Sequence, residues 1–445
     1  DCANRVLLLL CSNNIMLSIV HLSNNDIIGG ASRAAYRIHR CLEDNKSDYL
    51  IDSSMKVVRK YSSDPTVNCL NNNSYLWKRL QPRISRFIKS NFETANQSAH
   101  NIAYPNTGLL KEINNNQSLK KITHLHWLGD NTISIEEVGK LKGPIFWTLH
   151  DQWPFCGAEH YTHPPIIKNG LQINDFRYRQ NYSSKSRTFD EKGFDINRWT
   201  WERKKRSWTK PINIVATSSW LFECVKKSSL MKNWPIHLIP YPINTKNWKP
   251  INKLDAKNIL GIDPNKKVIL FGAIGGTKDS RKGSHILEEA LNILRDSYSE
   301  NIENRIQILV FGEESNKNFS NNLPVDFLGS FSDDISLRVV YSAADVMVVP
   351  SIQEAFGQTA SEAHACGTPV AAFNIGGLID IVSHQETGYL ADPFDPRSLA
   401  YGINWIIEDE ERNKKLSSQA RFKACLLYTS PSPRDRTRSR MPSSA

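Results

Sequence analysis

The chain has 445 residues, about three times the usual length of one domain, so two domains with separate cores are expected. Apolar residues make up 40% and charged residues 23%, as in globular proteins, and no apolar run approaches the ~18 residues that cross a membrane. The cysteines are scattered without a Cys-x-x-Cys pair, and no histidines cluster at metal-binding spacing. These features predict a soluble, cytoplasmic chain and argue against a secreted, disulfide-bonded domain.

The net charge of +11 remains positive when both ends of the chain are set aside. An electropositive surface suits anionic partners, which include phosphate esters, anionic lipid and nucleic acid. Charge alone leaves these three classes open.

The first half of the chain predicts a Rossmann-like domain over residues 16–240. Residues 1–15 precede Met16, which opens the first strand, "LSIVHLS", and we interpret them as a non-native leader. Further strands are predicted at "ITHLHWL", "PIFWTLHD" and "INIVATSS", each a short apolar run followed by polar residues.

Two loops of this half carry candidate site residues. Gly29 and Gly30 separate the first strand from a helix, where paired glycines allow close approach of a ligand and the helix N-terminus offers N–H groups to an anion. His150 and Asp151 end an apolar strand and are predicted to point toward a ligand. The alternatives are a glycine turn that only connects two elements, and a histidine bonded to a nearby carbonyl.

Two basic segments also lie in this half. Residues 75–90, "YLWKRLQPRISRFIKS", place apolar residues at helical spacing among cations, which predicts a helix lying on anionic lipid or, alternatively, a solvated helix packed on the sheet. Residues 198–208, "RWTWERKKRSW", interleave tryptophans with cations. Nucleic-acid binding is the alternative there, but no recognisable nucleic-acid module surrounds the segment, so no nucleic-acid partner is expected.

The proline-rich stretch "IPYPINTKNWKP", residues 239–250, marks a linker, and a second doubly wound α/β domain is predicted over residues 241–405. Its strands are short β-branched runs, each followed by a helical period or a glycine turn, as in parallel sheets buried on both faces. In such sheets, ligands bind beyond the carboxyl ends of the strands. Two α/β domains joined by a linker therefore predict a site between them, built from loops that follow strands.

The loop after the first strand of this domain is rich in glycine and cations. It contains Gly275, Gly276, Lys278, Arg281 and Lys282 just before a helix. Cations beside a helix N-terminus suit a diphosphate. A solvated charge cluster is the alternative.

A second loop follows the strand "VMVVP" and holds Glu354. Gly357 permits a tight turn before a helix that is predicted to begin near Gln358, and Glu362 lies about one turn inside that helix. Ionised carboxylates accept hydrogen bonds from adjacent hydroxyls, so this pair suits two vicinal diols on either side of a phosphate. Surface glutamates without a ligand are the alternative.

The chain ends in a helical segment, residues 406–424, followed by an abrupt change to Ser, Pro and Arg. We interpret residues 425–445 as an artefactual, disordered tail that builds no core element, the alternative being a basic tail that binds an acidic surface.

The stretch "EAFGQTASEAHACGTPVAAF", with Glu354 and Glu362 eight residues apart, resembles the signature of retaining glycosyltransferases of family 4. "HLHWL" and "WTLHDQWPFCGAEHY" resemble the members that assemble bacterial exopolysaccharide and colanic acid. The resemblance covers about residues 16–424. It implies the α/β GT-B fold, two facing Rossmann-like domains with an interdomain cleft, an acceptor-binding first domain and a nucleotide-sugar-binding second domain.

The resemblance also implies roles for the second carboxylate loop. Glu354 would contact hydroxyls of the donor sugar as a catalytic residue, and Glu362 would hold the ribose. Backbone N–H groups near Phe356, Gly357 and Gln358 would meet the diphosphate.

Further roles follow for the other loops. Lys282 and Arg281 would assist at the diphosphate, His150 would lie near the reacting sugar as a second catalytic residue, and Gly29 with Gly30 would lie close to the phosphates. The family transfers with retention, and no covalent nucleophile is required. Because the chain holds no Asp-x-Asp motif, we predict that no metal or other cofactor is needed.

Three departures from the family pattern stand out. The Gly-Arg pair expected after the first strand of the second domain is "FGAIGG", without an arginine, and the linker has Tyr241 and Asn244 where Asn and Asp are common. The last helix, which in this fold usually returns to the first domain, is expected to be cut after Ala424.

The sequence thus predicts an enzyme that moves a hexose from a UDP-, GDP- or ADP-sugar to a growing glycan, lipid-linked by expectation, at the inner face of the plasma membrane. A nucleotide-sugar epimerase on the same fold and a catalytically silent nucleotide-sugar-binding protein are the alternatives. The donor, the acceptor and the oligomeric state stay open.

Overall fold

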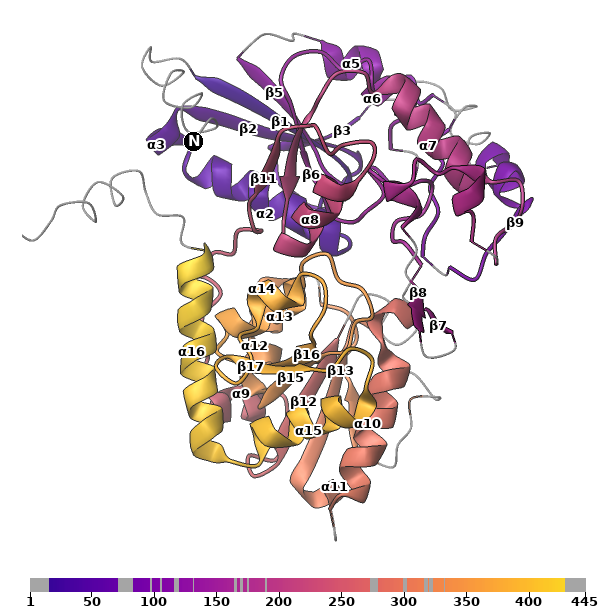
Figure 1. The fold of residues 1–445 in the computed structure, drawn as a ribbon. Helices are drawn as coiled ribbons and strands as arrows, with labels where there is room; N and C mark the ends of the chain where they lie inside the picture. The colour runs from indigo at the N-terminus through magenta and orange to yellow at the C-terminus, as the bar shows by residue number, and fades with distance from the viewer. Residues whose placement is uncertain are drawn as a thin grey trace, which may run out of the picture.

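The computed structural model describes residues 16–428 apart from 71–82, 97, 105, 116–119, 131, 164–165, 169–170, 174–175, 189, 273–278, 299–301, 316–318, 320–322 and 332. Two α/β units lie one above the other (Figure 1), and each is built on one parallel sheet. This is the predicted fold class.

The first sheet has the order β11-β10-β6-β5-β1-β2-β3, and all neighbouring strands are parallel. Its strands are β1 (Leu17–Asn25), β2 (Ile51–Arg59), β3 (Val67–Cys69), β5 (Lys121–Leu125), β6 (Ile145–Thr148), β10 (Asn213–Ala216) and β11 (Ile236–Leu238). The helices of this unit include α2 (Gly30–Asp44), α3 (Lys46–Tyr49), α5 (Leu110–Asn114), α6 (Ile135–Val138), α7 (Ile196–Ser207) and α8 (Ser219–Lys227). Two short antiparallel pairs join β4 (Phe92–Glu93) to β9 (Lys192–Gly193) and β7 (Ile166–Lys168) to β8 (Leu171–Ile173).

The second sheet has the order β14-β13-β12-β15-β16-β17 and is also parallel. Its strands are β12 (Lys267–Gly272), β13 (Ile306–Phe311), β14 (Val325–Phe327), β15 (Val346–Val349), β16 (Val370–Phe373) and β17 (Gly388–Ala391). Its helices include α9 (Lys253–Ile259), α10 (Ser284–Asp296), α11 (Ile302–Arg305), α12 (Asp334–Ala343), α13 (Gln358–Ala365), α14 (Leu378–Ile381), α15 (Pro396–Ile407) and α16 (Glu410–Tyr428).

Continuous apolar runs form the central strands of the second sheet because helices cover both of its faces. β13, β15 and β16 are buried at every position. Alternate residues of β12 enter different cores: Leu270 packs in one cluster with α12 and α13, whereas Ile269 packs in the other with α10 and α15. A strand buried on both faces therefore reads as an unbroken apolar run.

The last helix differs from its predicted bounds. α16 begins at Glu410 and continues to Tyr428, four residues past the predicted break at Ala424, because "CLL" still suits a helix and the Ser-Pro pairs come later. It runs along the second unit (Figure 1), where the Arg421 guanidinium donates to the carbonyl oxygens of Thr245, Trp248 and Ala365. The rest of the predicted tail, 429–445, lies outside the described residues.

The two basic segments have different surroundings. In 198–208, Trp201 and Trp208 are buried and Arg203 pairs with Glu136, so these tryptophans are not available to stack on bases. In 75–90, the structure describes a helix over 83–89, where Phe87 is 72% exposed, and 71–82 lie outside the described residues. Within the described part of the chain, no helix combines the length and apolar character needed to cross a membrane.

Candidate active site

The loop after β15 places Glu354 beside a lysine. Glu354 Oε2 accepts hydrogen bonds from Lys282 Nζ at 2.6 Å and from Ser351 Oγ at 3.2 Å. Burial alone would raise the pKa of the Glu354 carboxyl, but the charges of Lys282 and Arg281 outweigh it and hold that pKa below its usual value. Glu354 is therefore an ionised carboxylate in a buried setting.

Arg281 and Lys282 lie in a 3-10 turn, residues 280–282, just before α10. The Arg281 guanidinium donates to the carbonyl oxygen of Gln353 at 3.2 Å and lies 4.8 Å from the ring centre of Tyr161. The backbone N–H of Ile352 donates to the Arg281 carbonyl at 2.8 Å. The turn and the Glu354 loop, which follow the neighbouring strands β12 and β15, are thus joined by both backbone and side chains. Gly275, Gly276 and Lys278 lie outside the described residues.

Gly283 allows this close packing. Its φ is 72°, and a Cβ added there would lie 1.8 Å from the carbonyl oxygen of Pro350. Only a residue without a side chain fits, because the contacting atom is backbone and cannot rotate away.

Replacing Gly283 by alanine is expected to destabilise the second domain by about 2 kcal/mol or more, since the Pro350 backbone must move to admit the new methyl. That loss corresponds to a fall in Tm of roughly 4–8 °C, measured by circular dichroism. Gly261→Ala is the matched control, because Gly261 has φ 68° but open space around its would-be Cβ. Equal falls in Tm for the two variants would show that contact with the Pro350 backbone is not the cause of the loss of stability.

Glu362 lies inside α13 and is held by the other domain. Its Oε1 accepts from Arg37 Nη1 of α2 at 2.6 Å, and its Oε2 accepts from the Tyr341 hydroxyl at 2.8 Å. Arg37 also reaches Asp334 at 3.4 Å. The predicted helix start near Gln358 agrees with α13, but sequence reasoning missed Arg37 and Tyr341 as partners of this carboxylate.

The starts of α2 and α13 meet across the two domains. The side-chain amide of Gln358 donates to the Gly30 carbonyl at 2.6 Å. Gly29 and Gly357 precede the two helices and have φ of 96° and 106°. The residue before each helix therefore has a backbone conformation that favours glycine. These glycine loops, predicted separately, are neighbours in space.

His150 follows β6 and has partners at both ring nitrogens. Nδ1 lies 2.6 Å from the Tyr241 hydroxyl, and Nε2 lies 3.2 Å from Nδ1 of His126. Burial lowers the pKa of His150 to about 4, so the ring is neutral. Neither partner is the backbone carbonyl considered from sequence, and a role beside a reacting sugar stays a prediction.

Tyr241 connects His150 to the loop that precedes α13. Its ring stacks on His150 and packs edge-on against Phe356, with ring centres 5.4 and 4.7 Å apart. Tyr241 stood out in the sequence only as a departure from the family pattern, whereas in the structure it lies between candidate residues of the two domains. Asp151, the neighbour of His150, bonds instead to His160 Nδ1 at 2.6 Å.

The structure also brings together histidines that the sequence analysis did not group. His21, His124 and His126 each offer a ring nitrogen within 4.8 Å of the others. The expectation from sequence spacing did not extend to this cluster, because His21 lies about 100 positions away from the other two histidines. A His-x-His pair that begins at the end of one strand, with a histidine on another strand, was the available signal. Whether a metal is needed stays a prediction.

The two facing doubly wound units define the GT-B fold. Solved structures with the same fold include the sucrose-phosphate synthase of Thermosynechococcus elongatus, at TM-score 0.59 and 19% identity, and Anabaena Alr3699/HepE in complex with UDP-glucose, at TM-score 0.59 and 16% identity. Each comparison covers 93% of this chain and 95% of the other.

Residues 252–423 match the family model described as glycosyl transferases group 1. In sequence, this chain is 30% identical over 165 residues to an uncharacterized glycosyltransferase, MJ1607, of Methanocaldococcus jannaschii, covering 35% of this chain and 40% of the relative. It is 32% identical over 189 residues to a D-inositol 3-phosphate glycosyltransferase of Thermobispora bispora, covering 40% and 44%. The chain thus spans less than half the length of these curated relatives.

Proposed function

We propose that this protein is a retaining glycosyltransferase that moves a hexose from a nucleotide sugar to a growing glycan. The observation that carries the proposal is the pairing of Glu354 with Lys282 in loops that follow neighbouring strands, inside the part of the chain similar to group 1 glycosyltransferases. The GT-B fold supports it, since the HepE neighbour is described in complex with UDP-glucose.

Lys282 and Arg281 serve the departing diphosphate in this proposal. When the bond between sugar and phosphate breaks, negative charge grows on the phosphate oxygens, and fixed cations in a water-poor site stabilise it. Both cations lie in one turn beside α10 and belong to the same domain as the α13 N-terminus. That placement lets one domain hold the charged part of the donor.

Glu354 and Glu362 serve the uncharged parts of the donor. Ionised carboxylates accept two hydrogen bonds from adjacent hydroxyls, which suits a sugar ring at Glu354 and a ribose at Glu362. Each carboxylate is already bonded to a cation of the protein, and its remaining lone pairs are the ones that hydroxyls would use.

The chemical step proposed here uses no covalent intermediate. The acceptor hydroxyl attacks the sugar from the face that the diphosphate leaves, the bond from carbon to phosphate oxygen breaks, and the acceptor proton passes to that oxygen. The nucleoside diphosphate departs with the proton, and the configuration at the sugar carbon is retained. We propose that the step requires no metal at the diphosphate.

We further propose that the acceptor is lipid-linked and that transfer takes place at the cytoplasmic face of a membrane. The basic helix over 83–89, with Phe87 exposed, supports this placement, because cations and an exposed aromatic ring suit an anionic lipid surface.

The test is release of nucleoside diphosphate from UDP-, GDP- and ADP-sugars, with and without a glycan acceptor. We expect one donor to be consumed, faster with acceptor, at a rate that added Mg²⁺ or Mn²⁺ does not raise. The mass of the product and its anomeric configuration would be determined, and we expect the configuration of the donor sugar to be retained. Conversion of the donor to its epimer without acceptor would instead establish an epimerase, and binding of nucleotide without release from any donor would establish a silent binding protein.

A further inference from the structure

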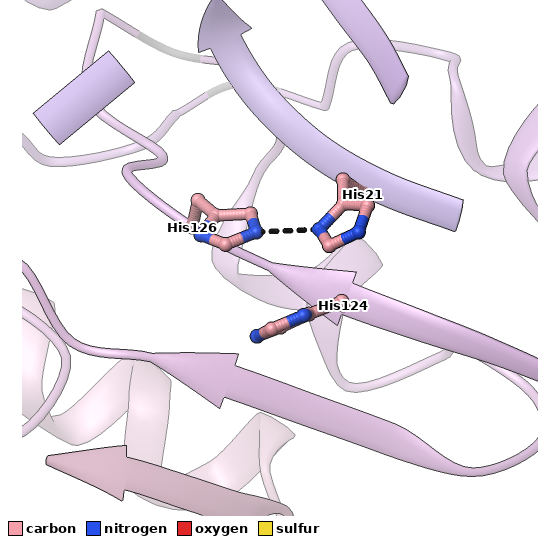
Figure 2. A group of neighbouring side chains, drawn as sticks. All are labelled: His21, His124 and His126. Carbon is pink, nitrogen blue, oxygen red and sulfur yellow. Dashed lines mark hydrogen bonds between the residues drawn. The ribbon is translucent and has the colours of Figure 1, made fainter. Parts of the chain in front are cut away.

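Three histidines gather on one face of the first sheet. β1 and β5 are neighbouring parallel strands, and His21 is the register partner of His124. His126 follows His124 by two residues and stays on the same side, because side chains alternate along an extended chain. Figure 2 shows the rings of His21 and His126 facing one another, with Nδ1 of His21 2.9 Å from Nε2 of His126, and the ring of His124 beside them.

The rings are in the form that binds metal ions. His21 and His126 are almost fully buried, and burial with the neighbouring histidines lowers the pKa of each well below its usual value. Burial lowers the pKa of His124 to about 3. Neutral imidazoles are the usual ligands of zinc, copper and nickel, whereas magnesium and calcium prefer oxygen.

The outer nitrogens of two of these rings are already bonded as those of metal ligands usually are. His124 Nε2 lies 2.8 Å from Thr148 Oγ1, and His126 Nδ1 lies 3.2 Å from His150 Nε2. Such contacts fix the orientation and tautomer of a metal-bound histidine. His21 Nε2 is buried and has no hydrogen-bond partner among the described residues.

We propose that His21, His124 and His126 bind one divalent transition-metal ion, of the zinc class, through one nitrogen each. The ion takes the position of the proton between His21 Nδ1 and His126 Nε2, and that proton moves to the other nitrogen of its own ring. The two ligand nitrogens then separate from 2.9 Å to the ~3.3 Å of two ligands on tetrahedral zinc. His124 contributes Nδ1, the nitrogen not bonded to Thr148. A water molecule completes the coordination.

The ion would order the chain of rings that leads to the candidate active site. With the metal on Nε2 of His126, its proton sits on Nδ1 and is donated to His150 Nε2. The His150 proton is then on Nδ1 and is donated to the Tyr241 oxygen. This site is separate from the diphosphate and does not depend on the proposed transfer reaction.

The experiment is uptake of Zn²⁺ by the folded chain without a polyhistidine tag, measured by equilibrium dialysis with metal analysis. We expect one ion per chain, with affinity at least about tenfold weaker in His124→Asn. His237→Asn is the matched control: it lies in the same sheet, it is half-exposed as His124 is, and both rings lie 6.5 Å from Phe146. It should bind as the wild type does.

A second readout needs no variant. Co²⁺ bound by three imidazoles and water gives strong visible absorption, whereas six-coordinate Co²⁺ on surface groups gives weak bands. No saturable uptake by the wild type, uptake unchanged in folded His124→Asn, or only the weak cobalt spectrum would each overturn the proposal.

Discussion

Replacing Glu354 by glutamine is expected to lower the turnover of the sugar nucleotide at least about 100-fold. The amide keeps the shape of the side chain but removes the charge that Lys282 faces at 2.6 Å and that sugar hydroxyls would bond. Charge-assisted hydrogen bonds contribute about 1.5–3 kcal/mol each, and ~2.7 kcal/mol lost in the transition state is a factor of about 100 in rate.

The measurement is steady-state release of nucleoside diphosphate, beside nucleotide affinity by calorimetry. We expect nucleotide affinity to change far less than turnover, because the proposed partner of Glu354 is the sugar. Glu386→Gln, an exposed glutamate of the same domain, is the control and should keep wild-type rates. Turnover of Glu354→Gln within tenfold of the wild type would remove this carboxylate from the proposed mechanism.

Replacing Lys204 by methionine is expected to destabilise the first domain by about 3 kcal/mol or more. Lys204 lies in α7 and is fully buried, and its ammonium donates to the carbonyl oxygens of Cys156 at 3.0 Å and Gly157 at 2.7 Å, and to that of Trp153. Its Nζ also lies 3.9 Å from the centre of the Trp153 ring, and burial lowers the pKa of Lys204 to about 7. Methionine fills similar volume but leaves three buried acceptors without this donor, which costs 1–3 kcal/mol for each group that water cannot reach.

We expect the Tm of the first domain to fall by roughly 6–12 °C, with unfolding monitored by tryptophan fluorescence. Lys205→Met is the matched control, since Lys205 is the next residue of the same helix and is exposed. It should shift stability by less than about 0.5 kcal/mol. Similar losses in the two variants would show that the three carbonyl contacts contribute little.

Local pattern was enough to predict the sheets and the approximate places of the loops. The runs around β12, β13, β15 and β16 are mostly apolar because both faces are covered, and the glycine before α13 marks where that helix begins. Because parallel strands end at the same edge of a sheet, Lys282 and Glu354 could be expected near one another.

Pairings across the two domains could not be predicted in this way. Arg37 and Glu362 are 325 positions apart, and nothing in the sequence around either shows that α2 faces α13. The histidine cluster lies within one domain but was missed because its members are also far apart along the chain. β5 lies beside β1 although three other strands separate them along the chain, so His21 and His124 become neighbours only through the order of the sheet.

The contact between Gly283 and Pro350 has a consequence for how such a molecule would work. It holds the turn that carries Arg281 and Lys282 against the loop that carries Glu354. We therefore expect these two segments of the second domain to move together. Polar contacts to the other domain include those of Arg37 with Glu362, Gln358 with Gly30 and Ser219 with Asp380. In the proposed reaction, a relative movement of the two domains would therefore leave the pairing of Lys282 with Glu354 intact, while it changes the contacts that Glu362 and Gln358 make with α2.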